Sequence, residues 1–264
     1  MRYTTTEHDT FARDFNRDRL VVLKNHNPRE KLRRRAAEFL TLMAAQIDRE
    51  KEISSCGAHR DYVTLPFKGL FADPAIYEDP DLLTIVGRVA KPEPVQYQLA
   101  SDTSPKGSGY QPWHADTPLQ FPEWQNNDTP SFQLAVNFAL CDVGDDNGAF
   151  ETILGTQRMN KENAVTGMTS GTIAWQRFSV PMGDVMVRDV QTVHRGTPNT
   201  TDRPRPMVAP GYSRRWHFRP EVEIRMLQNN LNKLRTGRSL LRFNPVVPDG
   251  EATGAPEKHR SFAY

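Results

Sequence analysis

A histidine and an aspartate separated by one residue, His114 and Asp116, have the types and spacing that suit metal chemistry. On an extended strand, residues two positions apart point to the same side, so this imidazole and this carboxylate would converge. They supply two of the three ligands of the facial triad that binds Fe(II) and leaves coordination positions open. We therefore expect an iron site that uses His114, Asp116 and one further histidine.

The His-x-Asp pattern alone is weak evidence, because the sequence contains it a second time at His59 and Asp61. The context favours His114, which stands at the entry to a β-rich region, whereas His59 lies between helical regions. A metal site needs rigid support, and a β core provides it. We predict that the segments 57–66 and 121–129 form lids beside the site, with His59 in the first of them.

The third ligand is predicted to be His194, which lies in a hairpin-like run over residues 186–196. The sequence separation between Asp116 and His194 is long enough for several strands to lie between the two ligand segments. Downstream, Arg205 immediately precedes a predicted strand. A guanidinium binds a carboxylate through two parallel hydrogen bonds, so Arg205 is well placed to anchor a dicarboxylic co-substrate. We expect Arg203 to lie at the surface.

The elements that must position these residues belong to a mainly β fold. The chain has 264 residues, of which 37% are hydrophobic and 25% are charged, and this composition is typical of a globular protein. From about residue 95, short β-rich runs alternate with turns that contain Gly, Pro, Asn and Asp. This pattern predicts a double-stranded β-helix, the jelly roll or cupin-like fold. The expected strands span residues 95–100, 132–140, 149–154, 184–188 and 207–216.

Helices are expected to flank this core at both ends. Thr5 and Thr6 lie at the start of a first predicted helix, and Asn27-Pro28 opens a second that runs to about Arg49, with a strand between them. A short helix is expected to end at Gly87, and a helical pattern returns after Pro220. We expect one domain over residues 1–264, with a helical N-terminal region (residues 1–93), a jelly-roll core (about 94–219) and a helical C-terminal region (220–264).

Charge and cysteine content narrow the class of partner. Lys and Arg number 34 against 32 Asp and Glu, and this net charge of +2 argues against a nucleic-acid partner. Two cysteines cannot form a disulfide framework, and the N-terminus has no apolar signal segment. No apolar stretch is long enough to span a membrane. We expect a cytoplasmic monomer or homodimer that acts on a small molecule.

Four segments of the chain carry a further pattern: residues 111–116, 147–158, 183–187 and 194–205. In their order and spacing they resemble the phytanoyl-CoA dioxygenase family of Fe(II)/2-oxoglutarate oxygenases, and the resemblance covers roughly residues 95–216. One departure is Gln157, which stands where the family usually has histidine. That position is not a metal ligand in the family.

The resemblance implies that His114, Asp116 and His194 bind iron, and that Arg205 holds the distal carboxylate of 2-oxoglutarate. It also implies O2 as the oxidant. Related halogenases have Gly or Ala in place of the metal-binding carboxylate. Because Asp116 is retained, the chain resembles an oxygenase rather than a halogenase.

Further polar residues are predicted to line the barrel. Alternation places Gln133 and Asn137 on one face of the strand 132–140, and Asn137 matches a family active-site position, although it could equally be a satisfied barrel amide. By the same alternation, Gln96 and Gln98 share a face. We expect co-substrate contacts from Asn137, Gln111 and Gln98. The candidates for substrate contact are Arg60, Gln96, Gln133, Trp175 and Trp216, of which the tryptophans could instead be core residues.

The sequence therefore predicts a dioxygenase that hydroxylates a small metabolite or natural-product intermediate while 2-oxoglutarate is converted to succinate. Desaturation, cyclisation and epimerisation use the same cofactor chemistry and stay open, because substrate placement decides among them. Two further alternatives are a non-catalytic jelly-roll protein that binds a metal or ligand, and an oxygenase that acts on a protein or nucleic acid.

Overall fold

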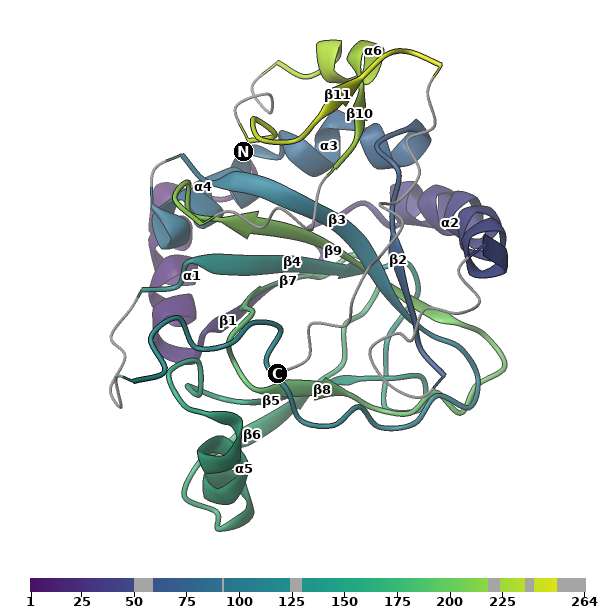
Figure 1. Cartoon of the computed structure of the whole chain (residues 1–264). Coiled ribbons are helices and arrows are strands. Elements are labelled where there is room, and N and C mark those ends of the chain that lie inside the picture. The colour runs from purple at the N-terminus through teal and green to yellow at the C-terminus, as the bar shows by residue number, and fades with distance from the viewer. Residues whose placement is uncertain (50–58, 92, 124–129, 218–223, 236–239, 251–264) are drawn as a thin grey trace.

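Two antiparallel sheets face each other in the computed structural model, which describes residues 1–49, 59–91, 93–123, 130–217, 224–235 and 240–250 (Figure 1). The large sheet has the strand order β1-β7-β4-β9-β3-β2, and the small sheet has the order β6-β5-β8. The large sheet consists of β1 (Leu20–Leu23), β2 (Asp61–Thr64), β3 (Val95–Ser104), β4 (Gln133–Ala139), β7 (Val185–Asp189) and β9 (Arg205–Ser213). The small sheet consists of β5 (Phe150–Ile153), β6 (Trp175–Phe178) and β8 (His194–Gly196).

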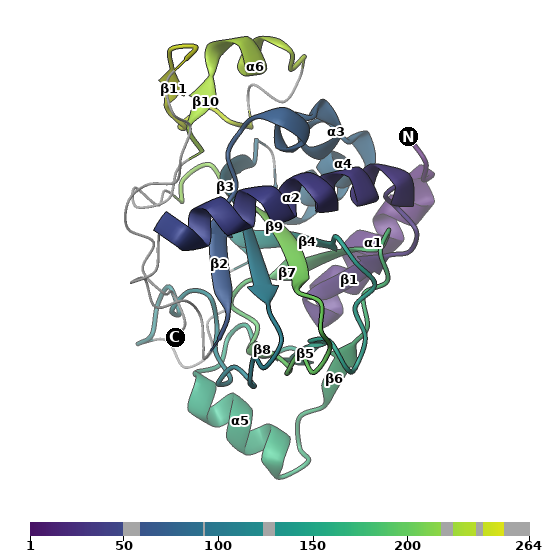
Figure 2. The same ribbon diagram turned by 90° about the vertical axis from the view of Figure 1, so that its right-hand side faces the viewer.

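Helices cover one face of the large sheet (Figure 2). On β4, Leu134, Val136 and Phe138 point to this face and belong to a core cluster that also contains Phe15 and Ile85 from the helices. The intervening residues of β4 point to the opposite face, toward the small sheet. The main hydrophobic core therefore lies outside the barrel, which leaves the space between the sheets for polar side chains. The N-terminal helices are α1 (Thr5–Asp18), α2 (Arg29–Arg49), α3 (Pro74–Tyr77) and α4 (Pro80–Ala90), with a 3-10 turn at Gly69–Ala72.

The arrangement confirms a mainly β jelly roll with flanking helices. At the N-terminus, the side chain of Thr4 accepts a hydrogen bond from the backbone of Glu7, and Glu7 reaches back to the backbone of Thr4, which forms a capping box at the start of α1. The predicted strand at Leu20–Leu23 pairs antiparallel with β7. Among the described residues, none of the helices combines the length and the hydrophobicity that a membrane span requires.

The fourth helix differs from the prediction, because Gly87 lies inside it and α4 continues to Ala90. A glycine inside a helix costs about 1 kcal/mol relative to alanine. Ile85, Val86 and Val89 are all buried in the core on the inner face of this helix. Because Val89 lies beyond Gly87, the helix gains hydrophobic burial on both sides of the glycine. This burial outweighs the cost of the glycine.

The C-terminal segment also differs from the predicted helical region. Its described residues contain only one short helix, α6 (Gln228–Asn232), beside a parallel pair of β10 (Met226–Leu227) and β11 (Val246–Val247). Ile224 and Met226 are buried at the spacing of two that suits a strand. The backbone of each finds a partner in the segment 244–247, which explains why the extended form is preferred there.

Candidate active site

The three predicted metal ligands meet at the edge of the small sheet, although His114 lies outside the named strands. The backbone of His114 pairs with that of His194 in an antiparallel bridge, with N–H···O distances of 3.0 and 2.8 Å. The backbone N–H of Asp116 donates to the carbonyl of Val190 at 2.9 Å. The run 186–196 is no hairpin, because β7 belongs to the large sheet and β8 to the small one. Between β7 and β8 the chain passes from the large sheet to the small one, and this places His194 beside the segment that contains His114.

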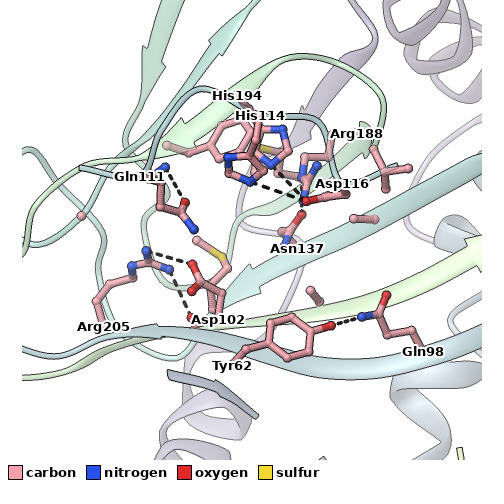
Figure 3. A pocket seen from close by; sticks show the side chains of 18 of the residues that line it. Tyr62, Gln98, Asp102, Gln111, His114, Asp116, Asn137, Arg188, His194 and Arg205 are labelled. Atoms are coloured by element: carbon pink, nitrogen blue, oxygen red, sulfur yellow. Dashed lines mark hydrogen bonds and ion pairs between the residues drawn. The ribbon is translucent and has the colours of Figure 1, made fainter. Parts of the chain in front are cut away.

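Both imidazoles point toward Asp116 (Figure 3), and hydrogen bonds to the backbone hold them in this orientation. The Nδ1 atoms of His114 and His194 each lie 2.8 Å from a backbone carbonyl, those of Pro112 and Thr192. Nδ1 therefore donates, and Nε2 carries the lone pair that a metal needs. The Nε2 atoms lie 3.8 and 3.4 Å from Oδ1 of Asp116. All three ligand atoms lie within 4.8 Å of one another.

The charge states suit metal binding at neutral pH. Burial, and then the neighbouring His194, lower the pKa of His114 to about 4, so this imidazole is neutral. Burial alone would raise the pKa of Asp116, but the positive charge of Arg188 and the adjacent His194 outweigh it and hold that pKa well below its usual range. A neutral imidazole and an ionised carboxylate are the ligand forms that Fe(II) requires.

Arg205 begins β9 and lines the same cavity as the three ligands. Its Nη2 donates to Oγ of Ser104 at 2.8 Å, and its Nη1 donates to the backbone carbonyl of Asp102 at 3.3 Å. Its buried Nε has no hydrogen-bond partner among the described residues. A buried guanidinium with a remaining donor fits the distal carboxylate of 2-oxoglutarate. Arg203 is exposed, as predicted.

Gly148 makes room for this guanidinium. A Cβ at this position would lie 3.2 Å from Nε of Arg205 and 3.3 Å from the carbonyl oxygen of Thr197, and the φ angle of Gly148 is +104°. Both the backbone angle and the space therefore require glycine.

We expect the substitution Gly148→Ala to weaken 2-oxoglutarate binding and to lower stability together. A strained backbone angle costs about 1–3 kcal/mol, and the added methyl group displaces Arg205. Gly107→Ala is the matched control, because Gly107 has a φ of +82° and open space around its Cβ position. Thermal unfolding should show a loss in both variants, whereas a rise in the KM for 2-oxoglutarate should appear in Gly148→Ala alone. An equal rise in both would contradict this account.

The cavity between the sheets has a volume of about 120 Å³. The structure brings four of the predicted polar residues to its wall, alongside the metal ligands and Arg205. Within this wall Gln111 also has a structural contact, since its Oε1 accepts a hydrogen bond from the backbone of Gly196 at 2.7 Å. The four predicted residues on the wall are Gln98, Gln111, Gln133 and Asn137.

Gln96 does not reach the cavity, contrary to the expectation that it shares a face with Gln98. The pairing of β3 with β9 shifts by one residue between Gln96 and Gln98, which is a β-bulge. The bulge turns Tyr97 and Gln98 both toward the cavity, whereas Gln96 is fully buried opposite the core residue Tyr212. A Cβ at Gly211 would lie 2.9 Å from the ring of Tyr97, so glycine is needed across from the bulge.

Arg60, Trp175 and Trp216 also lie outside the cavity wall. Arg60 is 2% exposed, packs against Gly196, and donates to Ser104 and Thr197 between the sheets, so its role is structural. Trp175 and Trp216 are 48% and 56% exposed.

The first of the two predicted lid segments, residues 57–66, needs correction. Asp61–Thr64 is the edge strand β2 rather than a loop, and Tyr62 on it lines the cavity. The exposed His59 precedes this strand and is not part of the cavity wall. Residues 57–58 and 124–129 of the predicted lids lie outside the described residues of the chain.

Sequence reasoning missed two charged residues of the wall, Asp102 and Arg188. On β7, Val185 and Val187 point into the core, so alternation places Met186 and Arg188 toward the cavity. The signal in the sequence that could have identified Arg188 is an arginine at an inward-facing position of a predicted strand. Asp102 was missed because β3 extends four residues beyond the predicted end of its strand, to Ser104.

Two facing sheets with a His–Asp–His triad between them are the arrangement of a mononuclear non-haem iron enzyme of the cupin-like type. A sequence profile of the phytanoyl-CoA dioxygenase family matches residues 11–207. The chain therefore belongs to this family, which consists of Fe(II)/2-oxoglutarate-dependent oxygenases.

Solved structures share the fold. The epimerase SnoN from nogalamycin biosynthesis has a TM-score of 0.59 and 19% identity, with 80% of this chain and 84% of that chain covered. HygX from Streptomyces hygroscopicus, with nickel and 2-oxoglutarate bound, has a TM-score of 0.59 and 16% identity, with 81% and 89% covered. The carbocyclase SnoK from nogalamycin biosynthesis has a TM-score of 0.59 and 14% identity, with 99% and 96% covered.

Proposed function

We propose that this protein is an Fe(II)/2-oxoglutarate-dependent dioxygenase that oxidises a small metabolite or natural-product intermediate. The observation that carries the proposal is the convergence of the ligand atoms of His114, Asp116 and His194 within 4.8 Å, in a cavity that Arg205 also lines. When bound there, iron and 2-oxoglutarate supply oxidative decarboxylation of the 2-oxo acid to succinate, which drives oxidation of the substrate.

The protein's own residues bind and orient these groups. Carbonyl contacts at Nδ1 hold both imidazoles in one tautomer and fix the direction of Nε2. Arg205 binds the distal carboxylate of 2-oxoglutarate through charge-assisted hydrogen bonds. The inward side chains of β4, including Asn137, shape the space that the substrate enters.

The substrate class is inferred from proteins of similar fold. SnoN and SnoK come from nogalamycin biosynthesis, and HygX has been solved with hygromycin B bound. A tailoring reaction on a natural-product intermediate is therefore proposed in preference to a reaction on an acyl-CoA. Hydroxylation is the simplest outcome.

Purified protein supplied with Fe(II), 2-oxoglutarate and oxygen is expected to form succinate, with stimulation by the true substrate in a metabolite screen. Removal of iron with a chelator should abolish this turnover, and readdition of iron should restore it. A non-catalytic ligand-binding protein would form no succinate under any of these conditions, and that result would refute the proposal.

The reaction type is tested on the product of the same assay by mass spectrometry under labelled oxygen gas. Hydroxylation is expected to add one labelled oxygen atom. Loss of two hydrogen atoms would indicate desaturation or cyclisation, and an unchanged mass would indicate epimerisation.

A further inference from the structure

The guanidinium of Arg188 has an unused donor in the cavity. Its Nη2 donates to Oδ2 of Asp116 at 2.8 Å, and its Nε donates to Oδ1 of Asn137 at 3.1 Å (Figure 3). Its Nη1 is buried and has no hydrogen-bond partner among the described residues. The residue is 9% exposed and lines the cavity. A buried charged donor without a partner is costly, which indicates that a ligand satisfies it.

Arg188 is held rigidly in this position. Its guanidinium lies 5.4 Å from the centre of the Phe150 ring, and its two hydrogen bonds are donated by two different nitrogens, Nε and Nη2. Asn137 lies on the neighbouring strand β4, which pairs with β7 beside it. The direction of Nη1 is therefore set before any ligand enters, as expected of a binding group.

The charges around the metal leave a place for an anion. Iron(II) and Arg188 together carry three positive charges. Asp116 and the metal-bound carboxylate of 2-oxoglutarate carry two negative charges, and the imidazole ligands are neutral. Arg205 and Asp102 lie on the other side of the cavity (Figure 3). Arg205 and Arg60 are 3.5 and 3.6 Å from Oδ2 of Asp102, and the charges of these two arginines match those of Asp102 and the distal carboxylate of 2-oxoglutarate. One positive charge beside the metal is therefore uncompensated, and a monoanionic substrate would balance it.

We infer that Arg188 binds a carboxylate of the substrate through Nη1 and so holds the reacting part of the substrate beside the metal. The inference rests on the proposed function and adds the substrate class, a compact carboxylic acid. The neighbouring wall is partly apolar, with Phe150 and Met186, so an acid with an apolar or aromatic body finds an apolar surface beside Arg188.

The test is the preference for an acid over its neutral amide. Protein loaded with Ni²⁺ and saturating 2-oxoglutarate is titrated by calorimetry with benzoate against benzamide, and with cyclohexanecarboxylate against its amide. In the wild type, the acids are expected to bind about 10- to 100-fold more tightly than the amides. In Arg188→Met this preference should disappear, and Arg188→Lys should retain some of it. Arg215→Met is the matched control, since Arg215 is exposed and pairs with Glu93.

Because the preference is a ratio within one variant, a general loss of affinity or stability does not imitate it. Equal binding of acids and amides by the wild type would overturn the inference, as would failure of every acid to bind at millimolar concentration. So would an Arg188→Met variant that binds Ni²⁺ or 2-oxoglutarate more weakly but keeps the preference, because Arg188 would then only position Asp116 or contact the co-substrate. If the wild type binds neither Ni²⁺ nor 2-oxoglutarate, the proposed function itself fails.

Discussion

Replacement of His194 by alanine is expected to abolish iron binding and 2-oxoglutarate-dependent succinate formation while the fold is retained. Mutation of residues that merely orient a metal ligand costs 10- to 100-fold in affinity or activity. Loss of a ligand should therefore lower activity by more than about 100-fold. The backbone bridge between His194 and His114 does not use the imidazole, so it should persist in the variant.

The measurement is the bound iron per chain together with the rate of succinate formation, and thermal unfolding monitors the fold. His59→Ala is the matched control, because His59 belongs to the other His-x-Asp pattern and lies outside the cavity wall. It should retain both iron and activity. Near-normal turnover by His194→Ala would show that the ligand assignment is wrong.

The second large effect is expected from Arg205→Ala, which should raise the KM for 2-oxoglutarate strongly. Truncating one partner of a buried, hydrogen-bonded charge pair costs about 2–5 kcal/mol, which corresponds to roughly 30- to 5,000-fold in affinity. Arg205 is 3% exposed, so solvent screens its interaction with a carboxylate little. The turnover number at saturating 2-oxoglutarate should fall much less than the affinity, because Arg205 lies apart from the metal ligands (Figure 3).

Steady-state kinetics with varied 2-oxoglutarate measures this effect. Arg203→Ala removes a guanidinium from an exposed position two residues away and should leave the KM unchanged. An Arg205→Ala variant that folds normally with an unaltered KM would place the anchor elsewhere. The KM of the Gly148→Ala variant provides an intermediate comparison, because its Arg205 guanidinium is present but displaced.

Alternation along a strand was a sound guide wherever the strand pairing was regular. It separates β4 into core residues such as Val136 and cavity residues such as Gln133 and Asn137, and the structure agrees. The same rule was wrong for Gln96, because a single extra residue in β3 ends the alternation. A bulge depends on what lies across the strand, here Gly211, and local sequence carries no sign of that pairing.

Local patterns failed in a similar way at the chain's helical ends. The glycine at position 87 was expected to end a helix, but burial of Val89 and Ala90 extends it. The apolar spacing after Pro220 was compatible with a helix, but residues 244–247 offer a strand partner to Met226. In each case a contact with a distant segment outweighs a local propensity of the order of 1 kcal/mol.

The sequence by itself determined the fold class, the family and the kinds of side chain available for the metal. Residue types, their order and the period of two along strands are local properties, so they can be read without knowing which strands pair. Tertiary structure alone decided which groups meet. The backbone bridge of His114 with His194 and the contact of Arg188 with Asp116 each join segments that are far apart in the chain. Their geometry depends on strand register and on the crossing between sheets, which long-range packing sets.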